Sequence, residues 1–179
     1  MKGKKILLGV TGGIAAYRVC DLIRELREKG AQVQVVMSEN AKQFITPLTL
    51  EALSANRVYS DGFAIGDNVE PLHTKLAKSA DLIVACPASA DIMAKFSHGL
   101  ANDLLSTIYL ASQAPVLIVP AMNNHMYKHP ATQANLEILK KRGNVFVEPI
   151  VGQLVCGDTD VGHLADQATI VSAIQSSLK

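Results

Sequence analysis

Short aliphatic runs alternate with longer amphipathic stretches along almost the whole chain. The aliphatic runs are apolar on both faces and predict strands at residues 4–10, 32–37, 81–85, 115–119 and 145–147. The other stretches predict helices at residues 14–29, 45–55, 72–79, 100–112, 132–142 and 166–178. Buried strands joined by helices of this length form parallel sheets that are covered on both faces. The alternation therefore predicts a three-layer α/β fold with a central parallel sheet.

The composition suits one globular domain with an aliphatic core. Of the 179 residues, 49% are hydrophobic and 18% charged, whereas aromatic residues make up only 4% and Trp is absent. The net charge is +1 and the basic residues are scattered, which gives no support for nucleic-acid binding. The apolar runs are too short to cross a membrane, and the amino terminus lacks a signal-peptide layout. We therefore expect one cytoplasmic domain over residues 1–179, with neither nucleic acid nor membrane as a partner.

Three cysteines stand in three different settings. Their odd number and the lack of CxxC spacing argue against a disulfide framework. Cys20 falls in a helical pattern and Cys86 ends a buried strand, so both are expected to pack as small apolar side chains. Cys156 differs because it lies in a polar, glycine-rich loop. Cys156 is therefore the cysteine to consider for function.

The unusual segments of the sequence gather at one edge of the predicted sheet. In open parallel sheets the ligand lies beyond the carboxyl ends of the strands. The segments expected at that edge are Thr11-Gly12-Gly13, Ser38, Pro87-Ala88-Ser89, residues 120–126 and the loop around Cys156. Their convergence predicts a binding site at this edge.

The segment Gly9-Val-Thr-Gly12-Gly13 is similar to a nucleotide-binding loop, although it is not GxGxxG. Glycines at such a turn let backbone N–H groups approach a phosphate at a helix amino terminus. A tight strand-to-helix turn would need similar residues. No acidic residue ends the second strand, where a dinucleotide site would bind a ribose hydroxyl; Ser38 stands there instead. The pattern favours a mononucleotide over NAD.

The loop after the fourth strand is hard to explain by structure alone. Residues 120–127 contain two methionines, two amides, a histidine and a tyrosine. Core packing can use methionines but gives no reason for the amides. His125 and His129 are four residues apart and could suggest a metal pair, but Pro130 follows at once and no third ligand is apparent. We expect the loop to serve the site and no metal to bind there.

Taken together, these motifs resemble those of the homo-oligomeric flavin-containing cysteine decarboxylases. Within this family the phosphopantothenoylcysteine decarboxylase branch of coenzyme A biosynthesis matches best, and the resemblance covers almost the whole chain. It rests on Gly-Val-Thr-Gly12-Gly13, Ser38 with Ala41-Lys42-Gln43-Phe44, residues 72–81, Pro87-Ala88-Ser89-Ala90-Asp91, residues 99–107, Pro-Ala-Met-Asn123 and Leu-Val-Cys156-Gly-Asp. The resemblance implies a Rossmann-like (flavodoxin-like) fold.

The resemblance also implies a cofactor and a set of site residues. The cofactor is FMN, and the residues that bind it are Gly12, Gly13, Ser38, Phe44, Pro87, Ala88, Ser89, Ala90, Ser106 and Ala121. His73 is implied as the catalytic acid/base, Asn123 as the residue that holds the substrate carboxylate with Met126 beside it, and Cys156 as a late proton donor. Family members are homotrimers or assemblies of trimers such as homododecamers, with flavin and substrate at subunit contacts, so we expect a homo-oligomer.

The implied reaction is decarboxylation of (R)-4′-phospho-N-pantothenoylcysteine to 4′-phosphopantetheine. A cysteine carboxylate cannot lose CO2 directly because the resulting carbanion has nowhere to spread, and flavin supplies the electron sink. Removal of the thiol proton needs a base that titrates near neutrality, which suits a histidine such as His73. An amide such as Asn123 can donate a hydrogen bond to a carboxylate without pairing it with a positive charge.

Other functions remain open. A peptidyl-cysteine decarboxylase of lantibiotic-type maturation forms an aminoenethiol and generally lacks the cysteine at position 156, so Cys156 and Asp91 favour the coenzyme A branch. A non-catalytic FMN-binding regulatory protein has no need for both His73 and Asn123, and a prenyl-transferring relative explains the motifs less well.

Two features depart from the family pattern. Gly162-His163-Leu164 stands where many bacterial relatives have Gly-Arg-Met, which puts substrate contact through this segment in question. The bacterial enzyme is often fused to a ligase domain, whereas this chain ends soon after Leu178, so we expect a free-standing decarboxylase or a part of a fused one.

Overall fold

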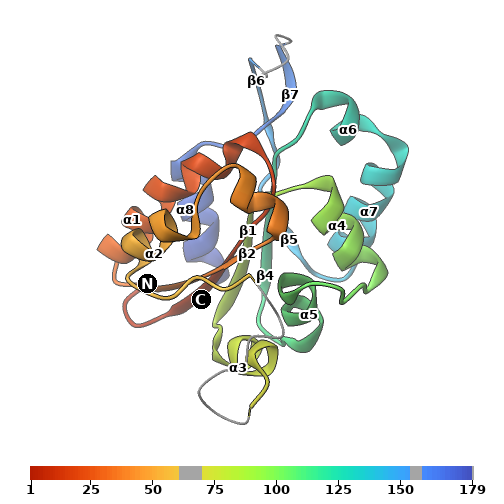
Figure 1. Cartoon of the computed structure of the whole chain (residues 1–179). Helices are drawn as coiled ribbons and strands as arrows, with labels where there is room; N and C mark the ends of the chain where they lie inside the picture. Colours follow the sequence, from red (N-terminus) through yellow and green to blue (C-terminus); the bar gives the residue numbers. More distant parts are fainter. Residues whose placement is uncertain (61–69, 154–158, 179) are drawn as a thin grey trace.

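Five parallel strands form the centre of the molecule, for which a computed structural model describes residues 1–60, 70–153 and 159–178 (Figure 1). The strands are β1 (Lys5–Val10), β2 (Gln32–Met37), β3 (Leu82–Ala88), β4 (Val116–Pro120) and β5 (Val145–Phe146). Their order across the sheet is β2-β1-β3-β4-β5. This is the flavodoxin-like order, which reverses between β1 and β3, and a ligand crevice opens at the carboxyl ends of the strands there. The predicted fold is confirmed.

Each face of the sheet packs against its own layer of helices (Figure 1). The first layer contains α1 (Val19–Glu28), α2 (Pro47–Ser54) and α8 (Gln167–Ser177). The second contains α3 (Leu72–Ser79), α4 (Ala90–His98), α5 (Leu104–Ala111) and α7 (Pro130–Lys141). None of the helices in the described part of the chain is long and apolar enough to cross a membrane.

Side-chain alternation along β1 explains how one strand serves both layers. Ile6 and Leu8 point into the first core, whereas Leu7 points into the second, and all three are almost fully buried. Strands buried on both faces read as continuous aliphatic runs, which is why the sequence pattern predicts them well. Phe96 of α4 and Tyr109 of α5 stack with ring centroids 4.0 Å apart in the second layer.

Several elements differ from the sequence prediction. The predicted helix at 14–29 begins as a 3-10 turn, η1 (Ile14–Arg18), before α1 starts. The predicted helix at 100–112 begins only at Leu104, because Gly99 ends α4 in a left-handed conformation and a short loop follows. The sequence pattern did not predict α4, the short helix α6 (Asn124–Lys128) or the antiparallel hairpin of β6 (Ile150–Gln153) and β7 (Thr159–His163).

Candidate flavin and substrate site

A cavity of about 450 Å³ opens at the carboxyl edge of the sheet, where β1, β3 and β4 end. Its walls come from four segments: residues 12–18 after β1, the start of α4, the loop and helix after β4, and the end of β7. The lining residues are Gly12, Gly13, Ile14, Ala15, Tyr17, Arg18, Ser89, Ala90, Ala121, Met122, Asn123, Met126, Gly162, His163 and Leu164. Small-molecule sites commonly have volumes of roughly 300–1,000 Å³, so the cavity can hold most of a cofactor or substrate.

The side chain of Thr11 joins the turn after β1 to the turn after β3, and both turns contribute residues to the cavity wall. Its buried hydroxyl donates a hydrogen bond of 2.6 Å to the carbonyl oxygen of Pro87 and accepts one of 2.9 Å from the N–H of Ser89. Pro87 follows a cis peptide bond after Cys86. The turn after β1 and the turn after β3 are therefore held in one fixed arrangement.

The glycine turn brings the backbone to the cavity surface. A Cβ atom at Gly12 would lie 2.6 Å from the Cβ of Asn40, so a larger residue would displace the neighbouring turn η2 (Glu39–Gln43). Gly13 lines the cavity and has open space where a Cβ would be. Because neither glycine has a side chain in the way, a planar ring or a phosphate can approach the main chain closely.

Asn123 is oriented by the helix that it begins. Its Oδ1 atom accepts hydrogen bonds from the N–H groups of His125 at 2.9 Å and Met126 at 3.3 Å, which makes Asn123 the N-cap of α6. In a carboxamide the NH2 group points away from the oxygen. The cap therefore fixes the direction of the donor end of a side chain that lines the cavity.

The predicted cofactor residues fall into two groups. Gly12, Gly13, Ser89, Ala90 and Ala121 line the cavity, as do the predicted substrate residues Asn123 and Met126. The others are not part of the cavity wall: Ser38, the N-cap of η2, whose hydroxyl accepts from the N–H of Ala41; Phe44, half exposed at the end of η2; Pro87 and Ala88, buried in β3; and Ser106, buried in α5. Both groups stay predictions as flavin contacts.

The predicted acid/base residue His73 lies elsewhere in the molecule. It belongs to α3, which packs against α5 in the second helix layer. Figure 1 shows α3 at the opposite end of the sheet from α6 and the β6–β7 hairpin. Among the residues that the structure describes, His73 is not part of the cavity wall. A single chain therefore does not bring His73 to Asn123. The third predicted catalytic residue, Cys156, lies outside the described residues.

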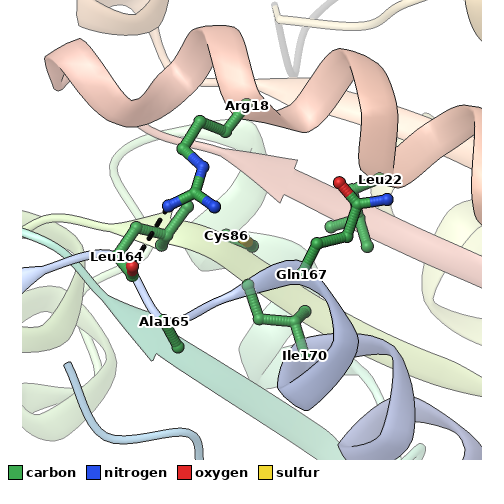
Figure 2. A pocket seen from close by; sticks show the side chains of 7 residues that line it. All are labelled: Arg18, Leu22, Cys86, Leu164, Ala165, Gln167 and Ile170. Atoms are coloured by element: carbon green, nitrogen blue, oxygen red, sulfur yellow. Dashed lines mark hydrogen bonds between the residues drawn. The ribbon is translucent and has the colours of Figure 1, made fainter. Parts of the chain in front are cut away.

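Three further polar side chains line the cavity, those of Tyr17, Arg18 and His163, and among these three the sequence motifs point only to His163. Arg18 and Tyr17 fall in a stretch that the sequence pattern explains fully as a helix, and only their position just after Gly12-Gly13 could have marked them. Nη1 of Arg18 donates a hydrogen bond of 3.2 Å to the carbonyl oxygen of Leu164 (Figure 2). This bond ties the turn after β1 to the end of β7.

Behind Arg18 lies a small hollow that has room for little more than one water molecule (Figure 2). Cys86 lines it, and burial raises the pKa of the Cys86 thiol to about 12. A thiol with so high a pKa stays protonated near neutrality and is a poor nucleophile. Cys86 therefore packs as an apolar side chain, as expected. No group of three or more His, Cys, Asp or Glu residues suited to a metal ion occurs among the described residues.

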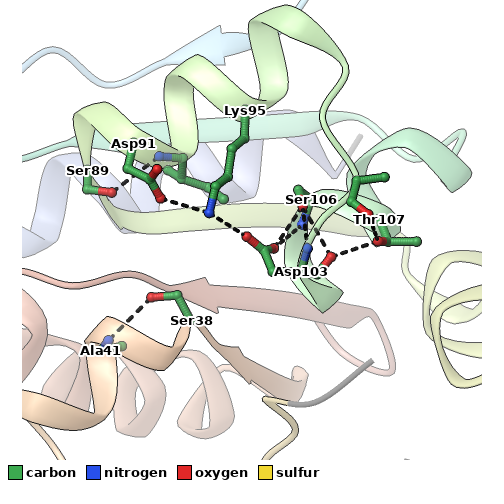
Figure 3. A network of polar contacts seen from close by, with 10 residues as sticks. Ser38, Ala41, Ser89, Asp91, Lys95, Asp103, Ser106 and Thr107 are labelled. Atoms are coloured by element: carbon green, nitrogen blue, oxygen red, sulfur yellow. Dashed lines mark hydrogen bonds and ion pairs between the residues drawn. The ribbon is translucent and has the colours of Figure 1, made fainter. Parts of the chain in front are cut away.

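A polar network beside the cavity connects α4 to α5 (Figure 3). Nζ of Lys95 lies 3.0 Å from Oδ2 of Asp91 and 2.8 Å from Oδ2 of Asp103, and Asp103 caps α5 by accepting from the N–H of Ser106. Burial opposes the charge of Lys95, but hydrogen bonds to Asp103 and Asp91 raise its pKa. Burial likewise opposes the charge of Asp103, but bonds from Lys95 and Ser106 lower its pKa.

Asp103→Asn is expected to reduce the free energy of unfolding at neutral pH by about 1–3 kcal/mol, because the cap survives while the partner of a largely buried ammonium group is lost. The folded-state pKa of Asp103 is lowered, so its contribution is present above the unfolded pKa of about 3.9 and is lost as the pH falls through the folded value. Urea unfolding at several pH values measures the difference. Asp91→Asn removes the other carboxylate partner of Lys95, and the side chain of Asp91 is 61% exposed. We expect it to reduce the free energy of unfolding by less than about 1 kcal/mol. Equal costs for the two variants would contradict this account.

Comparison with known proteins places these features in a family. A family model described as Flavoprotein matches residues 1–179. The Coenzyme A biosynthesis bifunctional protein CoaBC of Escherichia coli is 48% identical over 178 residues, which cover 96% of this chain and 42% of that protein. The CoaBC protein of Bacillus subtilis is 43% identical over 171 residues, which cover 96% of this chain and 42% of that protein. The chain thus spans less than half the length of these curated relatives.

Solved structures agree over nearly the whole chain. A PPC decarboxylase mutant complexed with pantothenoylaminoethenethiol has a TM-score of 0.89 at 28% identity, and the match covers 98% of each chain. The FMN-dependent cysteine decarboxylase SpaF has a TM-score of 0.86 at 30% identity, covering 98% of this chain and 95% of SpaF. The FMN binding protein AtHal3 has a TM-score of 0.85 at 28% identity, covering 98% of this chain and 96% of AtHal3.

Proposed function

This chain belongs to the flavoprotein family, and we propose that it binds FMN and decarboxylates (R)-4′-phospho-N-pantothenoylcysteine to 4′-phosphopantetheine in coenzyme A biosynthesis. The observation that carries the proposal is the placement of Asn123, an amide donor fixed by a helix cap, on the wall of a cavity at the point where the strand order reverses. The curated relatives that act in coenzyme A biosynthesis and the PPC decarboxylase structure support the same reaction.

The cavity fits FMN where the turns that follow β1, β3 and β4 line it. The main chain at Gly12 and Gly13 offers close approach to a phosphate or a ring, and Ser89, Ala90 and Ala121 leave a smooth wall of small side chains. Ser38, at the carboxyl end of β2, adds a hydroxyl next to this turn, since its N–H donates to the carbonyl oxygen of Val10. When bound, FMN supplies the electron sink that allows a cysteine carboxylate to lose CO2.

Asn123 and Met126 line the same cavity, and the substrate would lie beside them. The NH2 group of Asn123 donates a hydrogen bond to the substrate carboxylate and so fixes the bond that breaks. A neutral donor suits this task because a full ion pair would stabilise the very charge that disappears when CO2 leaves. The side chain of Met126 is half exposed and can pack against the acyl part of the substrate.

We infer that His73 acts on the substrate held by another copy of the chain. Near neutrality a histidine can take the thiol proton, but α3 lies far from the cavity of its own chain (Figure 1). A homo-oligomer, a trimer or an assembly of trimers, would let α3 of one copy reach the cavity of the next. The large apolar side chains Phe44, Leu48, Leu100 and Leu110 are about half exposed or more, as expected of surfaces that pack against another copy.

The test of the proposal compares two candidate substrates, each of which carries a cysteine carboxylate. Holoprotein loaded with FMN is incubated with phosphopantothenoylcysteine or with a peptide that ends in cysteine, each labelled with ¹³C in the carboxyl group, and labelled CO2 is measured. We expect release from phosphopantothenoylcysteine only. Release from the peptide alone would assign the chain to peptidyl-cysteine decarboxylation instead.

In air, Cys156→Ser is expected to keep releasing CO2 but to yield a product that lacks two hydrogens, with dioxygen taking up the two electrons, because the resemblance assigns Cys156 the late proton. Serine cannot replace the thiol as an acid of moderate pKa. The measurement is the ratio of CO2 to 4′-phosphopantetheine, which should rise far above one in the variant. Cys20→Ser is the matched control, since Cys20 packs against the first core. A normal yield of 4′-phosphopantetheine from Cys156→Ser would remove Cys156 from the reaction.

A further inference from the structure

Two segments of the cavity wall that are distant in sequence pack directly against each other. One is the loop after β4 with α6, which carries Met122 and Asn123, and the other is the end of β7, which carries Gly162. The N–H of Met122 donates a hydrogen bond of 3.0 Å to the carbonyl oxygen of Gly162. Gly162 has a positive φ of 134°, and a Cβ there would overlap the carbonyl oxygen of Met122. The two backbones therefore approach as closely as a glycine allows.

Asp160 of β7 joins the same two segments through side chains. Its Oδ2 atom accepts hydrogen bonds from Nδ2 of Asn124 at 2.9 Å and from Nζ of Lys128 at 2.6 Å. Its Oδ1 atom accepts from the N–H of Val161 at 2.7 Å, which holds the carboxylate in one orientation. The bonds from Lys128, Asn124 and Val161 keep the pKa of Asp160 far below its usual range, so the carboxylate is charged at any working pH.

The two partners of Asp160 are the first and last residues of α6. A helix of five residues has no stability of its own and takes its position from tertiary contacts. Asn124 is 5% exposed, and its Oδ1 atom has no hydrogen-bond partner among the described residues. The bond from Nδ2 to Asp160 is therefore the one hydrogen bond of the Asn124 side chain within the described residues, and without it Asn124 is expected to move.

Asn123 precedes Asn124 directly, so any movement of α6 carries the cap residue with it. We propose that Asp160 is a positioning residue: by holding both ends of α6 it fixes Asn123 relative to β7 and sets how tightly the cavity holds a substrate carboxylate. The inference rests on the proposed function only in that Asn123 meets the substrate. Lys128 has a second task, because it neutralises a carboxylate that would otherwise repel an anionic substrate near Asn123.

The experiment combines kinetics with amide hydrogen exchange on the FMN-loaded protein. Asp160→Ala is expected to raise KM about tenfold or more, with the FMN dissociation constant unchanged, and to speed exchange in residues 120–128 by a similar factor. Asp160→Asn keeps an oxygen that accepts from Asn124 and should raise KM less, which gives a second variant if the alanine variant folds poorly. Asp166→Ala is the matched control, since the Asp166 carboxylate also accepts hydrogen bonds from a main-chain N–H and a side chain, both of Thr169, but caps α8.

The variant Lys128→Met tests whether Asp160 acts by holding α6 in position or by its negative charge. Alone it leaves an uncompensated carboxylate and should raise KM, whereas Asp160→Asn combined with Lys128→Met keeps the bond to Asn124 without either charge and should bring KM back towards the wild-type value. Unchanged KM and unchanged exchange in Asp160→Ala would overturn the role of Asp160. An inactive wild-type protein would instead refute the proposed function, and the exchange data would still decide whether Asp160 positions α6.

Discussion

Replacement of His73 by asparagine is expected to reduce turnover by about 10²- to 10⁴-fold while the purified protein keeps its yellow FMN. Asparagine is close to histidine in size and can hydrogen-bond, but it cannot take up or release a proton near neutrality. The flavin should remain because His73 is not among the residues predicted to bind FMN, and steady-state rates together with FMN titration measure both effects. His98→Asn is the control, since in the described part of the chain Nδ1 of His98 bonds to Ser97 and the Ala94 carbonyl, both within α4.

Loss of FMN from the His73→Asn variant would mean that His73 supports the flavin site rather than the reaction. A mixture of variants tests whether two copies share one site. In mixed oligomers of His73→Asn and Asn123→Asp chains, some sites would combine native His73 from one chain with native Asn123 from the other. Co-expression of the two inactive variants should therefore restore part of the activity. No restoration would place both residues of a working site in the same chain.

Asn123→Asp is expected to lower kcat/KM by about 10²- to 10⁴-fold, because it replaces the donor that faces the substrate carboxylate with a second negative charge. The aspartate keeps an oxygen for the N–H groups of His125 and Met126, so α6 should still begin at the same residue. The melting temperature and the FMN dissociation constant should therefore stay close to the wild-type values. Asn123→Ser, which also keeps a cap, should lose activity but less of it. Full activity in the aspartate variant would exclude Asn123 from carboxylate binding.

The fold could be predicted well where burial leaves a pattern in the sequence. Runs such as Ile6-Leu7-Leu8 are aliphatic because both faces of β1 are covered. The β6–β7 hairpin leaves no such pattern: Ile150 and Val151 are exposed, and residues 159–163 are mostly polar. Its position depends on tertiary contacts such as that of Asp160 with α6, which no local periodicity reveals. Helix α4 was not predicted, because its first residues were interpreted only as part of a binding motif. Ile92, Met93 and Phe96 nevertheless have the spacing of one helix face.

The candidate site could be predicted in its location and only partly in its composition. Gly12, Ser89 and Asn123 were expected at one edge because parallel strands end there together, and all three line the same cavity. Arg18 was missed since an arginine in an amphipathic helix looks like any solvated residue. The place of His73 could not be deduced from one chain, because its predicted partners do not lie beside it there and, under our proposal, belong to another copy. The roles of Cys156 and of the remaining flavin residues, like the cytoplasmic location and the oligomer, stay predictions.

The measurement that tests the central claim most directly is the mass of the product formed by FMN-loaded protein from phosphopantothenoylcysteine. We predict a product lighter than the substrate by one CO2, which corresponds to 4′-phosphopantetheine and requires both decarboxylation and reduction. A product lighter by one CO2 and two further hydrogens would show that the reaction stops at the enethiol, as in peptide-processing decarboxylases. An unchanged mass, with FMN bound and the substrate intact, would contradict the proposed function.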